Sequence, residues 1–538
     1  IYGGDQLVSS QNLIMKKFSF LSLILLPAIL FSFTGSGQAQ NVTIDLDSTF
    51  QTIRGFGAAN IVDWYGQDLT MDDVDVAYGT GEGTLGFNIL RLRISPNPAD
   101  WDNGNQIETA RKAHEMGALV WAAPWNPPAD MYDPNSDQRK VDPTKYDLYA
   151  AHLDSFRVFM ENNGVPIYAI SVQNEPDYAN DWTAWEPEEV VTFLRDYAPM
   201  IGTKVMSAES FQFRLSYYDP ILTDSLATAN TDIIGGHIYG GGIAKYPLAA
   251  EKDKEVWMTE HYTSSDRSAN MWPDALEVGK EIHRVMNANW NAYVWWQIKR
   301  YYSPIHDGVD ADTDNFVDRA SVGSITKRGW VMSQFSRFIR PGYTRVFADG
   351  PYERGYVNVL TSAYVDSARS KMVIVAVNGE SAEKDINVNL NGLTTHSFSR
   401  YITSEDDNVE QLDDLQIEGF NFSATLPANS ITTFVSSDLV ATSVEEPLAA
   451  PLNYQLHQNY PNPFNPGTSI SYHLPVNSNV TLKVFDAVGR EVATLVNGQQ
   501  SAGEHSVNFN AAGLSSGVYL YRLETGNFVS TKKMLLIK

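Results

Sequence analysis

The stretch IYAISVQNEP (residues 167–176) begins as an unbroken apolar run and ends in polar side chains. Similar runs recur along the chain and are separated by longer segments of helical period, such as YDLYAAHLDSFRVFMENN (146–163). Strands that are apolar at nearly every position are typical of parallel sheets covered on both faces. The other runs are LGFNILRLRI (85–94), ALVWAAPW (118–125), KVMSAES (204–210), IIGGHIY (233–239), EVWMTEH (255–261) and AYVWWQI (292–298), with one more around residues 52–58.

This pattern predicts an α/β fold, with a (β/α)₈ TIM barrel over residues 55–342. A doubly wound open sheet is the alternative. It is disfavoured because the chain has no glycine-rich phosphate loop after a strand.

After residue 342 the hydrophobic pattern changes to period two. The runs KMVIVAVN (371–378), INVNLNG (386–392) and SITTFV (430–435) are separated by turn residues. They predict an antiparallel sheet with one wet face, which we assign to a β-sandwich side domain over residues 343–436. The segment 41–54 has similar character, so we expect it to pair into the same domain.

The chain is expected to close with a small all-β domain. Residues 437–454 have the composition of a linker, and residues 455–538 follow it. Three period-two runs predict a small β-sandwich there: VTLKVFD (480–486), EHSVNFN (504–510) and VYLYRLE (518–524).

Export is predicted at the N-terminal side. A basic start at Met15-Lys16-Lys17, an apolar run and the small-x-small pattern Gly37-Gln38-Ala39 predict a signal peptide over residues 15–39. A membrane anchor is the alternative, but Pro27 interrupts the apolar run. The mature protein is therefore expected to begin near Gln40 and to be secreted or held at the cell surface.

Composition excludes several functions. The 538 residues include 39 Lys and Arg against 64 Asp and Glu, a formal charge of −25, so a nucleic-acid or anionic-membrane partner is disfavoured. The chain has no cysteine, which excludes disulfides, zinc ribbons and thiol nucleophiles.

Two glutamates carry the predicted chemistry. Glu175 and Glu260 each follow an apolar strand and are expected three strands apart, facing one another across the barrel mouth. A pair of carboxylates can hydrolyse a glycosidic bond, one as proton donor and one at the oxocarbenium-like centre. The charged nucleophile raises the pKa of its partner and keeps the acid protonated. Asn174 is expected to offer an amide to the sugar 2-hydroxyl.

Aromatic residues gather at the strand ends and adjoining loops, as is common in sugar sites. About half of them are expected to be core residues, including Trp121 and Trp257. The set comprises Trp121, Trp125, Trp182, Trp185, Tyr239, Trp257, Trp295 and Trp296.

At this point the chain resembles family 30 glycoside hydrolases of the glucuronoxylanase subgroup, over residues 41–438. The motifs are Arg54-Gly55-Phe56-Gly57, Pro124-Trp125-Asn126-Pro127-Pro128, Ser171-Val172-Gln173-Asn174-Glu175-Pro176, Trp257-Met258-Thr259-Glu260-His261-Tyr262, Lys327-Arg328-Gly329 and Arg340-Pro341-Gly342-Tyr343.

The resemblance implies that Glu175 is the general acid/base and Glu260 the nucleophile of a retaining reaction. It places Asn174, Trp125 and Tyr239 around the cleaved sugar. It also implies a pocket for the 4-O-methylglucuronate branch of xylan, where an arginine pairs with the uronate carboxylate. The matching positions are Arg300, Tyr262, Ser265, Trp296 and Tyr302.

Two departures from the family pattern bear on that pocket. Gln297 stands where the family usually has an aromatic residue. The following loop, HDGVDADTDNFVDRAS (306–321), is enlarged and acidic. Asp310, Asp312 and Asp314 alternate as in a calcium loop, but the expected glycine and closing glutamate are missing. A solvated acidic turn is therefore favoured, and no metal or cofactor is expected.

The tail resembles the type A sorting domain of type IX secretion, through Tyr460-Pro461-Asn462-Pro463-Phe464, Gly489-Arg490-Glu491-Val492, Ser516-Gly517-Val518-Tyr519 and Lys532-Lys533-Met534-Leu535. This resemblance implies passage through the outer membrane and removal of the tail. A carbohydrate-binding module is the alternative, but the few aromatics there suit a packed core.

Together these observations predict a secreted, monomeric, retaining endo-β-1,4-xylanase that cleaves glucuronoxylan. Two alternatives stay open. The enzyme could be a glucuronate-independent xylanase or a xylobiose-releasing enzyme of the same family. The other alternative is a non-catalytic xylan-binding surface protein. Members of the wider family that act on β-glucosides are disfavoured only through Arg300 and its neighbours.

Overall fold

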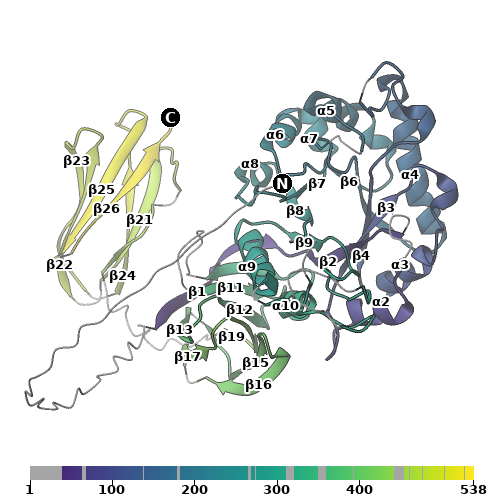
Figure 1. Ribbon diagram of the computed structural model, residues 1–538. Helices are drawn as coiled ribbons and strands as arrows, with labels where there is room; N and C mark the ends of the chain where they lie inside the picture. The colour runs from purple at the N-terminus through teal and green to yellow at the C-terminus, as the bar shows by residue number, and fades with distance from the viewer. Residues whose placement is uncertain are drawn as a thin grey trace, which may run out of the picture. The chain divides into compact units, whose positions relative to one another are not determined.

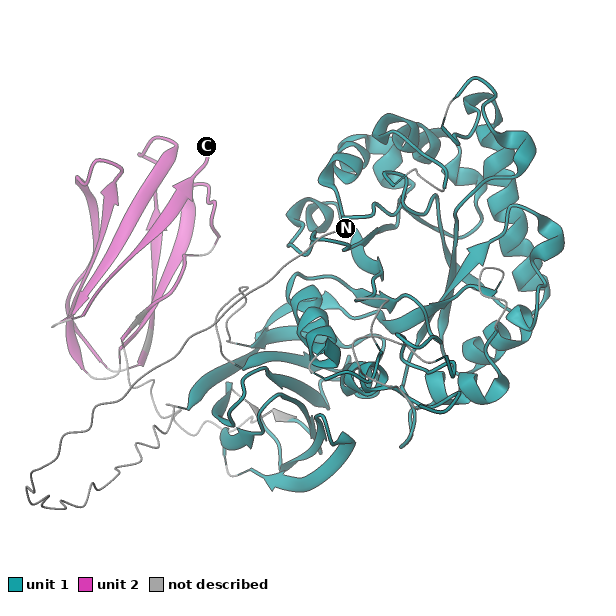
Figure 2. Cartoon of the chain, viewed as in Figure 1, with its two compact units in different colours: residues 1–442 teal, residues 443–538 magenta. Residues whose placement is uncertain are grey.

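The computed structural model divides the chain into two compact units, residues 1–442 and 443–538 (Figure 2). The expected signal peptide, apart from its last residue, and most of the expected linker lie outside the described residues. Within the described residues, no helix is long and apolar enough to cross a membrane. The described residues are 39–62, 68–136, 138–178, 182–263, 268–272, 274–309, 320–348, 359–391, 393–417, 419–441, 454–459, 461–474, 477–501, 503–525 and 528–538.

Eight parallel strands close the barrel that the sequence predicts (Figure 1). Each strand pairs with the next along the chain, and the first pairs with the last, as in the register Gly57 to Val294. The strands are β2 (Gly55–Asn60), β3 (Ile89–Ile94), β4 (Leu119–Pro124), β5 (Ile167–Ser171), β6 (Lys204–Met206), β7 (Ile233–His237), β8 (Glu255–Glu260) and β9 (Ala292–Trp295).

Helices surround the barrel and cover its outer face (Figure 1). In α4 the residues Tyr149, Leu153, Phe156 and Met160 recur at helical spacing and are buried against the strands. The helices are α2 (Met71–Tyr78), α3 (Gln106–Glu115), α4 (Tyr146–Asn162), α5 (Pro187–Asp196), α6 (Leu215–Thr223), α7 (Ser225–Ala229), α8 (Pro247–Glu251), α9 (Asp274–Asn287) and α10 (Lys327–Ser336).

The barrel interior is a packed core. Trp121 and Trp257, which we expected to be core residues, are fully buried among Ala169, Met206 and Val294. Tyr168 stacks on Trp257 at 5.9 Å between ring centroids. The interior is therefore filled by side chains, and chemistry is confined to the carboxyl ends of the strands.

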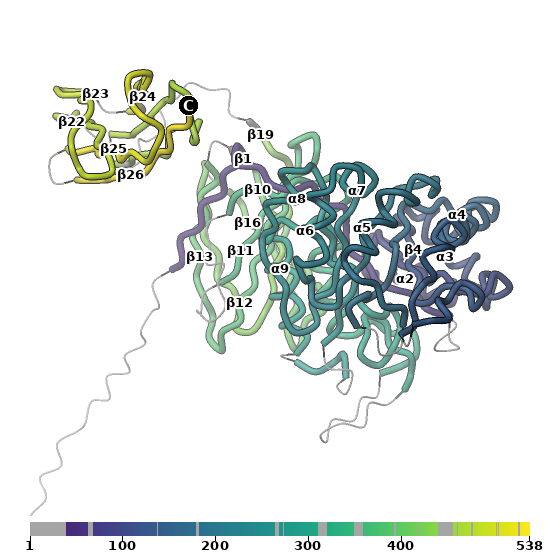
Figure 3. The backbone as a smooth tube through the Cα atoms, turned by 90° about the horizontal axis from the view of Figure 1, so that it is seen from above, coloured from purple at the N-terminus to yellow at the C-terminus, as the bar shows by residue number. Residues whose placement is uncertain are grey.

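The β-rich side domain is a nine-stranded sheet in the order β16-β15-β18-β12-β11-β10-β1-β13-β17 (Figure 3). The N-terminal strand β1 lies inside it, antiparallel to β10 and parallel to β13. The strands are β1 (Gln40–Thr52), β10 (Thr344–Ala348), β11 (Leu360–Val365), β12 (Met372–Asn378), β13 (Lys384–Asn391), β15 (Ser397–Thr403), β16 (Asn408–Gln416), β17 (Asn421–Leu426) and β18 (Ser430–Ser436); β14 (Leu393–Thr394) pairs with β19 (Val440–Ala441).

The expectation of one wet face is correct for only part of this sheet. In β13 buried and exposed residues alternate, as predicted. In β12 every residue is buried, and in β18 only Val435 is partly exposed. The reason is that the outer face of these strands packs on the barrel helices, where Ile431 and Val377 join the barrel core. The sheet also folds over itself, which brings Phe422 to 5.1 Å from Phe398 between ring centroids.

The C-terminal unit consists of two sheets around a core of its own. One sheet has the order β20-β21-β24 and the other β23-β22-β25-β26. Phe464, Tyr472, Phe509 and Tyr521 are buried in this core, as expected for packing residues. The strands are β20 (Gln455–Leu456), β21 (Gly467–Leu474), β22 (Ser478–Asp486), β23 (Glu491–Gln500), β24 (Gly503–Asn510), β25 (Gly517–Thr525) and β26 (Phe528–Leu536).

Candidate active site

Glu175 lies four residues beyond the end of β5, in a strained backbone conformation. Its φ of +46° is in the left-handed region, which L-residues other than glycine enter at a cost of about 1–2 kcal/mol. A backbone hydrogen bond holds it there, because the Glu175 N–H donates to the carbonyl of Glu209 at 2.9 Å. The residue is buried, at 4% exposure.

Glu260 is the last residue of β8, three strands along the barrel from β5. One carboxylate oxygen accepts a hydrogen bond from the Tyr239 hydroxyl at 2.9 Å. The other accepts one from the Arg91 guanidinium. Both oxygens of the carboxylate are therefore held by hydrogen-bond donors.

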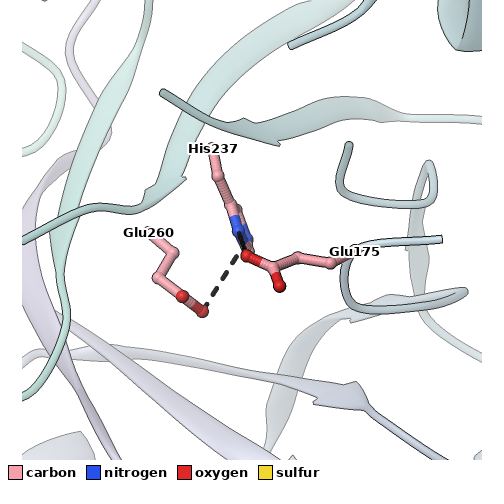
Figure 4. A group of neighbouring side chains, drawn as sticks. All are labelled: Glu175, His237 and Glu260. Carbon is pink, nitrogen blue, oxygen red and sulfur yellow. Dashed lines mark hydrogen bonds and ion pairs between the residues drawn. The ribbon is translucent and has the colours of Figure 1, made fainter. Parts of the chain in front are cut away.

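The two glutamates face one another (Figure 4). An oxygen of Glu175, an oxygen of Glu260 and a ring nitrogen of His237 all lie within 4.8 Å of one another. Both side chains lie over the barrel mouth, as the sequence predicts.

Arg91 is a fully buried cation on β3 that connects three polar groups. Besides Glu260, it donates to the Asn174 side-chain oxygen at 2.6 Å and to Glu209 at 3.2 Å. Aromatic faces surround it, since its guanidinium carbon lies 4.8 Å from the Trp125 ring centroid and 5.1 Å from that of Trp121. Burial opposes its charge, but the carboxylates of Glu209 and Glu260 more than offset this, so the pKa of Arg91 is raised.

His237, at the end of β7, joins the acidic residues on its two sides. Its Nδ1 is 2.8 Å from Glu175 and its Nε2 is 3.3 Å from Glu209. Burial alone would favour the neutral ring, but the negative charge of Glu260 and the hydrogen bonds to Glu175 and Glu209 raise its pKa to about 10. At neutral pH both ring nitrogens therefore carry protons and act as donors.

The protonation of the cluster follows from these contacts. Burial raises the pKa of Glu175, and the charge of Glu260 adds to the shift, against the lowering effect of His237. Burial also disfavours the charge of Glu209, but Arg91 and His237 outweigh it and lower the pKa of Glu209. Two cations, Arg91 and His237, therefore lie among three acidic side chains in a buried site, where each offsets part of the desolvation penalty.

Two further groups point at the reacting centre. The indole nitrogen of Trp182 donates to the second oxygen of Glu175 at 3.0 Å. The amide nitrogen of Asn174 is buried and has no hydrogen-bond partner among the described residues. Since the Asn174 oxygen is held by Arg91, this nitrogen is fixed as a donor toward the site.

The aromatic residues that we expected near the strand ends divide between the core and the site. Trp185 packs on Tyr146 at 5.1 Å in a helical core cluster, and Trp295 is fully buried. Trp125 is only 1% exposed, so its ring supports Arg91 and offers little open surface. Its ring centroid lies 5.9 Å from that of Trp296.

The residues matched to the uronate pocket lie beside Glu260. The ring of Tyr262 is 5.4 Å from Tyr239 and 5.3 Å from Tyr302, so a row of tyrosines leads from Glu260 to the turn that contains Arg300. Arg300 Nε is 3.5 Å from a carboxylate oxygen of Asp307, a buried residue at the start of the enlarged loop. Ser265 and residues 310–319 of that loop lie outside the described residues.

Arg328 fixes the backbone on both sides of this pocket. Its guanidinium donates to the carbonyl of Tyr302 at 2.9 Å and to that of Thr263 at 3.2 Å. This gives a physical reason for the Lys327-Arg328-Gly329 motif, because α10 ties together the loops that follow β8 and β9.

Glu175, His237 and Glu260 also have the spacing of a metal-ligand group. The contacts of these three side chains fit hydrogen bonding among them better than they fit a bound metal ion. Both nitrogens of His237 are engaged with carboxylates, and Arg91 contacts the same Glu260 oxygen that lies nearest to His237. A cation would have to displace a guanidinium and an imidazolium proton.

Sequence reasoning missed Arg91, Glu209, His237 and Arg328 as site residues. The signal was present for the first three, since each is a charged or titratable residue within or just after an otherwise apolar barrel strand.

Comparisons with known proteins show what the chain is similar to. The chain is 42% identical over 430 residues to glucuronoxylanase XynC of Bacillus subtilis, which covers 78% of this chain and 96% of that protein. A family 30 endoxylanase from Clostridium papyrosolvens is 38% identical, with a TM-score of 0.63 over 74% of this chain and 100% of the other. The family 30 subfamily 8 xylanase Xyn30A from Clostridium acetobutylicum is 34% identical, with a TM-score of 0.64 over 74% and 99%.

The closed barrel, its attached sheet and the opposed glutamates define a barrel glycoside hydrolase. The chain belongs to glycoside hydrolase family 30, among the xylanases similar to subfamily 8. Residues 458–538 match the family described as the secretion system C-terminal sorting domain. This confirms the sorting domain, which marks the chain for type IX secretion to the cell surface or beyond.

Proposed function

We propose that this protein is a retaining endo-β-1,4-xylanase that cleaves glucuronoxylan and recognises its (4-O-methyl)glucuronate branch. One observation carries the retaining mechanism: one oxygen of Glu175 and one oxygen of Glu260 lie within 4.8 Å of one another. Retaining glycosidases have carboxyl groups about 5–5.5 Å apart, whereas inverting enzymes need about 6.5–9.5 Å to admit a water molecule.

In the first step, Glu175 donates its proton to the glycosidic oxygen while Glu260 attacks the anomeric carbon. The glycosidic bond breaks, the shortened xylan chain leaves with the proton, and a glycosyl ester forms on Glu260. The raised pKa of Glu175 supports the donor role. Arg91 and Tyr239 hold the two oxygens of Glu260 in position for this attack.

In the second step, Glu175 acts as a base toward a water molecule, which attacks the anomeric carbon and releases Glu260. Two inversions give net retention of configuration. The amide nitrogen of Asn174 is available to donate to the 2-hydroxyl of the sugar, a contact that strengthens in the transition state.

Recognition of the uronate is assigned to the pocket around Arg300. A guanidinium binds a carboxylate through two parallel hydrogen bonds, and Tyr262 and Tyr302 supply aromatic walls next to it. Trp296 lies at the end of β9, three residues beyond Tyr293 and close to Trp125. Ser265 completes the proposed set by the family resemblance.

The contact between Arg300 and Asp307 favours a second candidate, a xylanase that does not require the branch. Asp307 brings a negative charge to 3.5 Å from Arg300, where it competes with a uronate. Gln297 removes one aromatic contact as well. Recognition of the branch therefore requires that Arg300 can still donate hydrogen bonds to the uronate carboxylate while it lies next to Asp307.

The test combines product analysis with a variant. Mass analysis of oligosaccharides released from methylglucuronoxylan should place the branch at a fixed distance from the new reducing end, and NMR should detect the β-anomer first. Arg300→Gln should raise KM on this substrate by roughly tenfold or more, with little change on unbranched xylan. Equal cleavage of branched and unbranched xylan by the native enzyme would favour the second candidate.

We also propose that the N-terminal segment 15–39 is a signal peptide, that the type IX machinery removes the C-terminal tail, and that the enzyme acts as a monomer on polysaccharide outside the cell. The sorting-domain match supports the export route. N-terminal sequencing and mass measurement of the secreted protein test both cleavages.

A further inference from the structure

A cavity of about 650 Å³ lies outside the barrel wall, next to the active site but separate from it. Its walls come from the loop between β7 and α8, from His261 directly after β8, and from α9, elements that Figure 1 labels next to one another. The lining residues are Ile238, Gly240, Gly241, Gly242, Ile243, Ala244, Lys245, His261, Glu281, Arg284, Asn287 and Ala288. No residue of the proposed mechanism or uronate pocket is among them.

The cavity contains a half-buried guanidinium with no acidic partner. Within the described part of the chain, Arg284 Nε is buried without a hydrogen-bond partner, and no carboxylate lies within ion-pair distance of the side chain. The chain as a whole has a net charge of −25, with 64 Asp and Glu against 39 Lys and Arg. Lys245 adds a second, exposed positive charge to the lining.

The negative group in the cavity is already engaged. Glu281 Oε1 accepts hydrogen bonds from the Tyr293 hydroxyl at 2.7 Å and lies 2.8 Å from His261 Nδ1. Glu281 and Arg284 are three residues apart on α9 and line the same side, yet they do not pair. No described carboxylate therefore competes with a ligand for the guanidinium of Arg284.

The opposite wall contains three consecutive glycines. Gly240, Gly241 and Gly242 all have positive φ, at 87°, 151° and 96°. A side chain at Gly242 would meet the backbone oxygen of Gln212 at 2.7 Å, so only glycine fits this close approach. Ile238 and Ile243 add apolar surface beside them.

We infer that this cavity is a second binding site, with Arg284 at its centre, for a carboxylate-bearing sugar of the xylan chain. A single guanidinium in a partly apolar cavity of this volume suits a uronate-substituted saccharide, because the carboxylate takes the charge and the ring takes the apolar wall. This inference rests on the proposed substrate. It gives the enzyme an additional contact with branched xylan outside the cleft.

The test is a calorimetric titration on the full chain carrying Glu260→Gln, which prevents turnover. The probe is xylotetraose bearing one 4-O-methylglucuronate. Two binding events per chain are expected, and adding Arg284→Gln should weaken one of them by roughly tenfold or more. Unbranched xylotetraose should show no event that depends on Arg284.

Two further variants keep the result interpretable. Ala244→Glu places a negative charge on the exposed lining without touching the core, and it should abolish the same event. Arg195→Gln, at an exposed arginine paired with Asp196, is the matched control and should change neither event.

The titration distinguishes failure of this second site from failure of the proposed function. Loss of the other event in Arg300→Gln reports on the cleft, independently of Arg284. If neither Arg284→Gln nor Ala244→Glu alters the titration, the second site does not exist. Competition by acetate as strong as that by the oligosaccharide would also overturn it, since the site would then bind any small carboxylate.

Discussion

At the scale of single residues, Glu209 contacts several groups of the site although it takes no part in the proposed reaction steps. Its carboxylate accepts from both Arg91 and His237, and its backbone carbonyl holds the N–H of Glu175. Each of these neighbours contacts one of the two proposed catalytic carboxylates. Glu209 is therefore a positioning residue, fully buried and away from the substrate.

Glu209→Gln should lower kcat by roughly ten- to a hundredfold while KM changes little, because misplaced groups slow the chemistry more than binding. Without the negative charge, the pKa of His237 falls, and its ring interacts more strongly with Glu175. While the ring stays protonated, its stronger contact and the loss of a nearby negative charge both lower the pKa of Glu175. The alkaline limb of the activity profile should therefore move to lower pH. Steady-state kinetics over a pH series measure this.

The matched control is Glu188→Gln, an exposed glutamate on α5, which should leave the pH profile unchanged.

The pH dependence of the unfolding free energy tests the same assignment. The pKa of His237 is raised from about 6.5 to about 10, so its contribution is complete at lower pH and is lost as pH rises through about 10. Glu209→Gln should reduce this alkaline loss, and an unchanged profile and stability curve would contradict the assignment.

At the scale of elements, α10 packs closely against the turn that follows β9. A Cβ on Gly329 would lie 2.4 Å from the backbone oxygen of Pro304, in the turn that follows Arg300 and Tyr302. Gly329→Ala must push that turn away, which should destabilise the fold by about 1–3 kcal/mol. It should also raise KM on glucuronoxylan more than on unbranched xylan.

Thermal unfolding and kinetics on the two substrates measure these effects. Gly81→Ala is the matched control, since nothing lies within 4 Å of a Cβ there and its backbone is ordinary. We expect it to be neutral. Equal behaviour of the two variants would mean that the turn adjusts freely and that α10 does not set the pocket.

The elements also show where prediction from sequence succeeds. Apolar runs located all the barrel strands, and the strand ends located Glu175 and Glu260, because the carboxyl ends of parallel strands meet at one face. The predicted strand at 204–210 ends instead at Met206, since Ser207 to Ser210 leave the ladder and Glu209 forms an isolated bridge with Asn174. Such long-range pairings are not encoded in local periodicity.

The expectation of a wet face is wrong at β12 for a different reason. This strand is apolar at six of its seven positions, a composition typical of strands covered on both faces, and barrel helices cover its outer face. The pairing of Arg300 with Asp307 was unpredictable, because it depends on how a loop returns to the turn from which it starts.

At the scale of the whole molecule, the catalytic unit and the C-terminal unit each have their own core. The aromatic residues of the C-terminal core are buried, so they offer no platform for sugar rings. A protein ending at residue 442 should therefore keep its kcat/KM on soluble glucuronoxylan, its affinity for insoluble xylan and its unfolding temperature. Pull-down on insoluble xylan, kinetics and calorimetry compare it with the full chain. Weaker binding to insoluble xylan after truncation would restore the alternative of a carbohydrate-binding module, because sorting alone gives no reason for the tail to hold substrate.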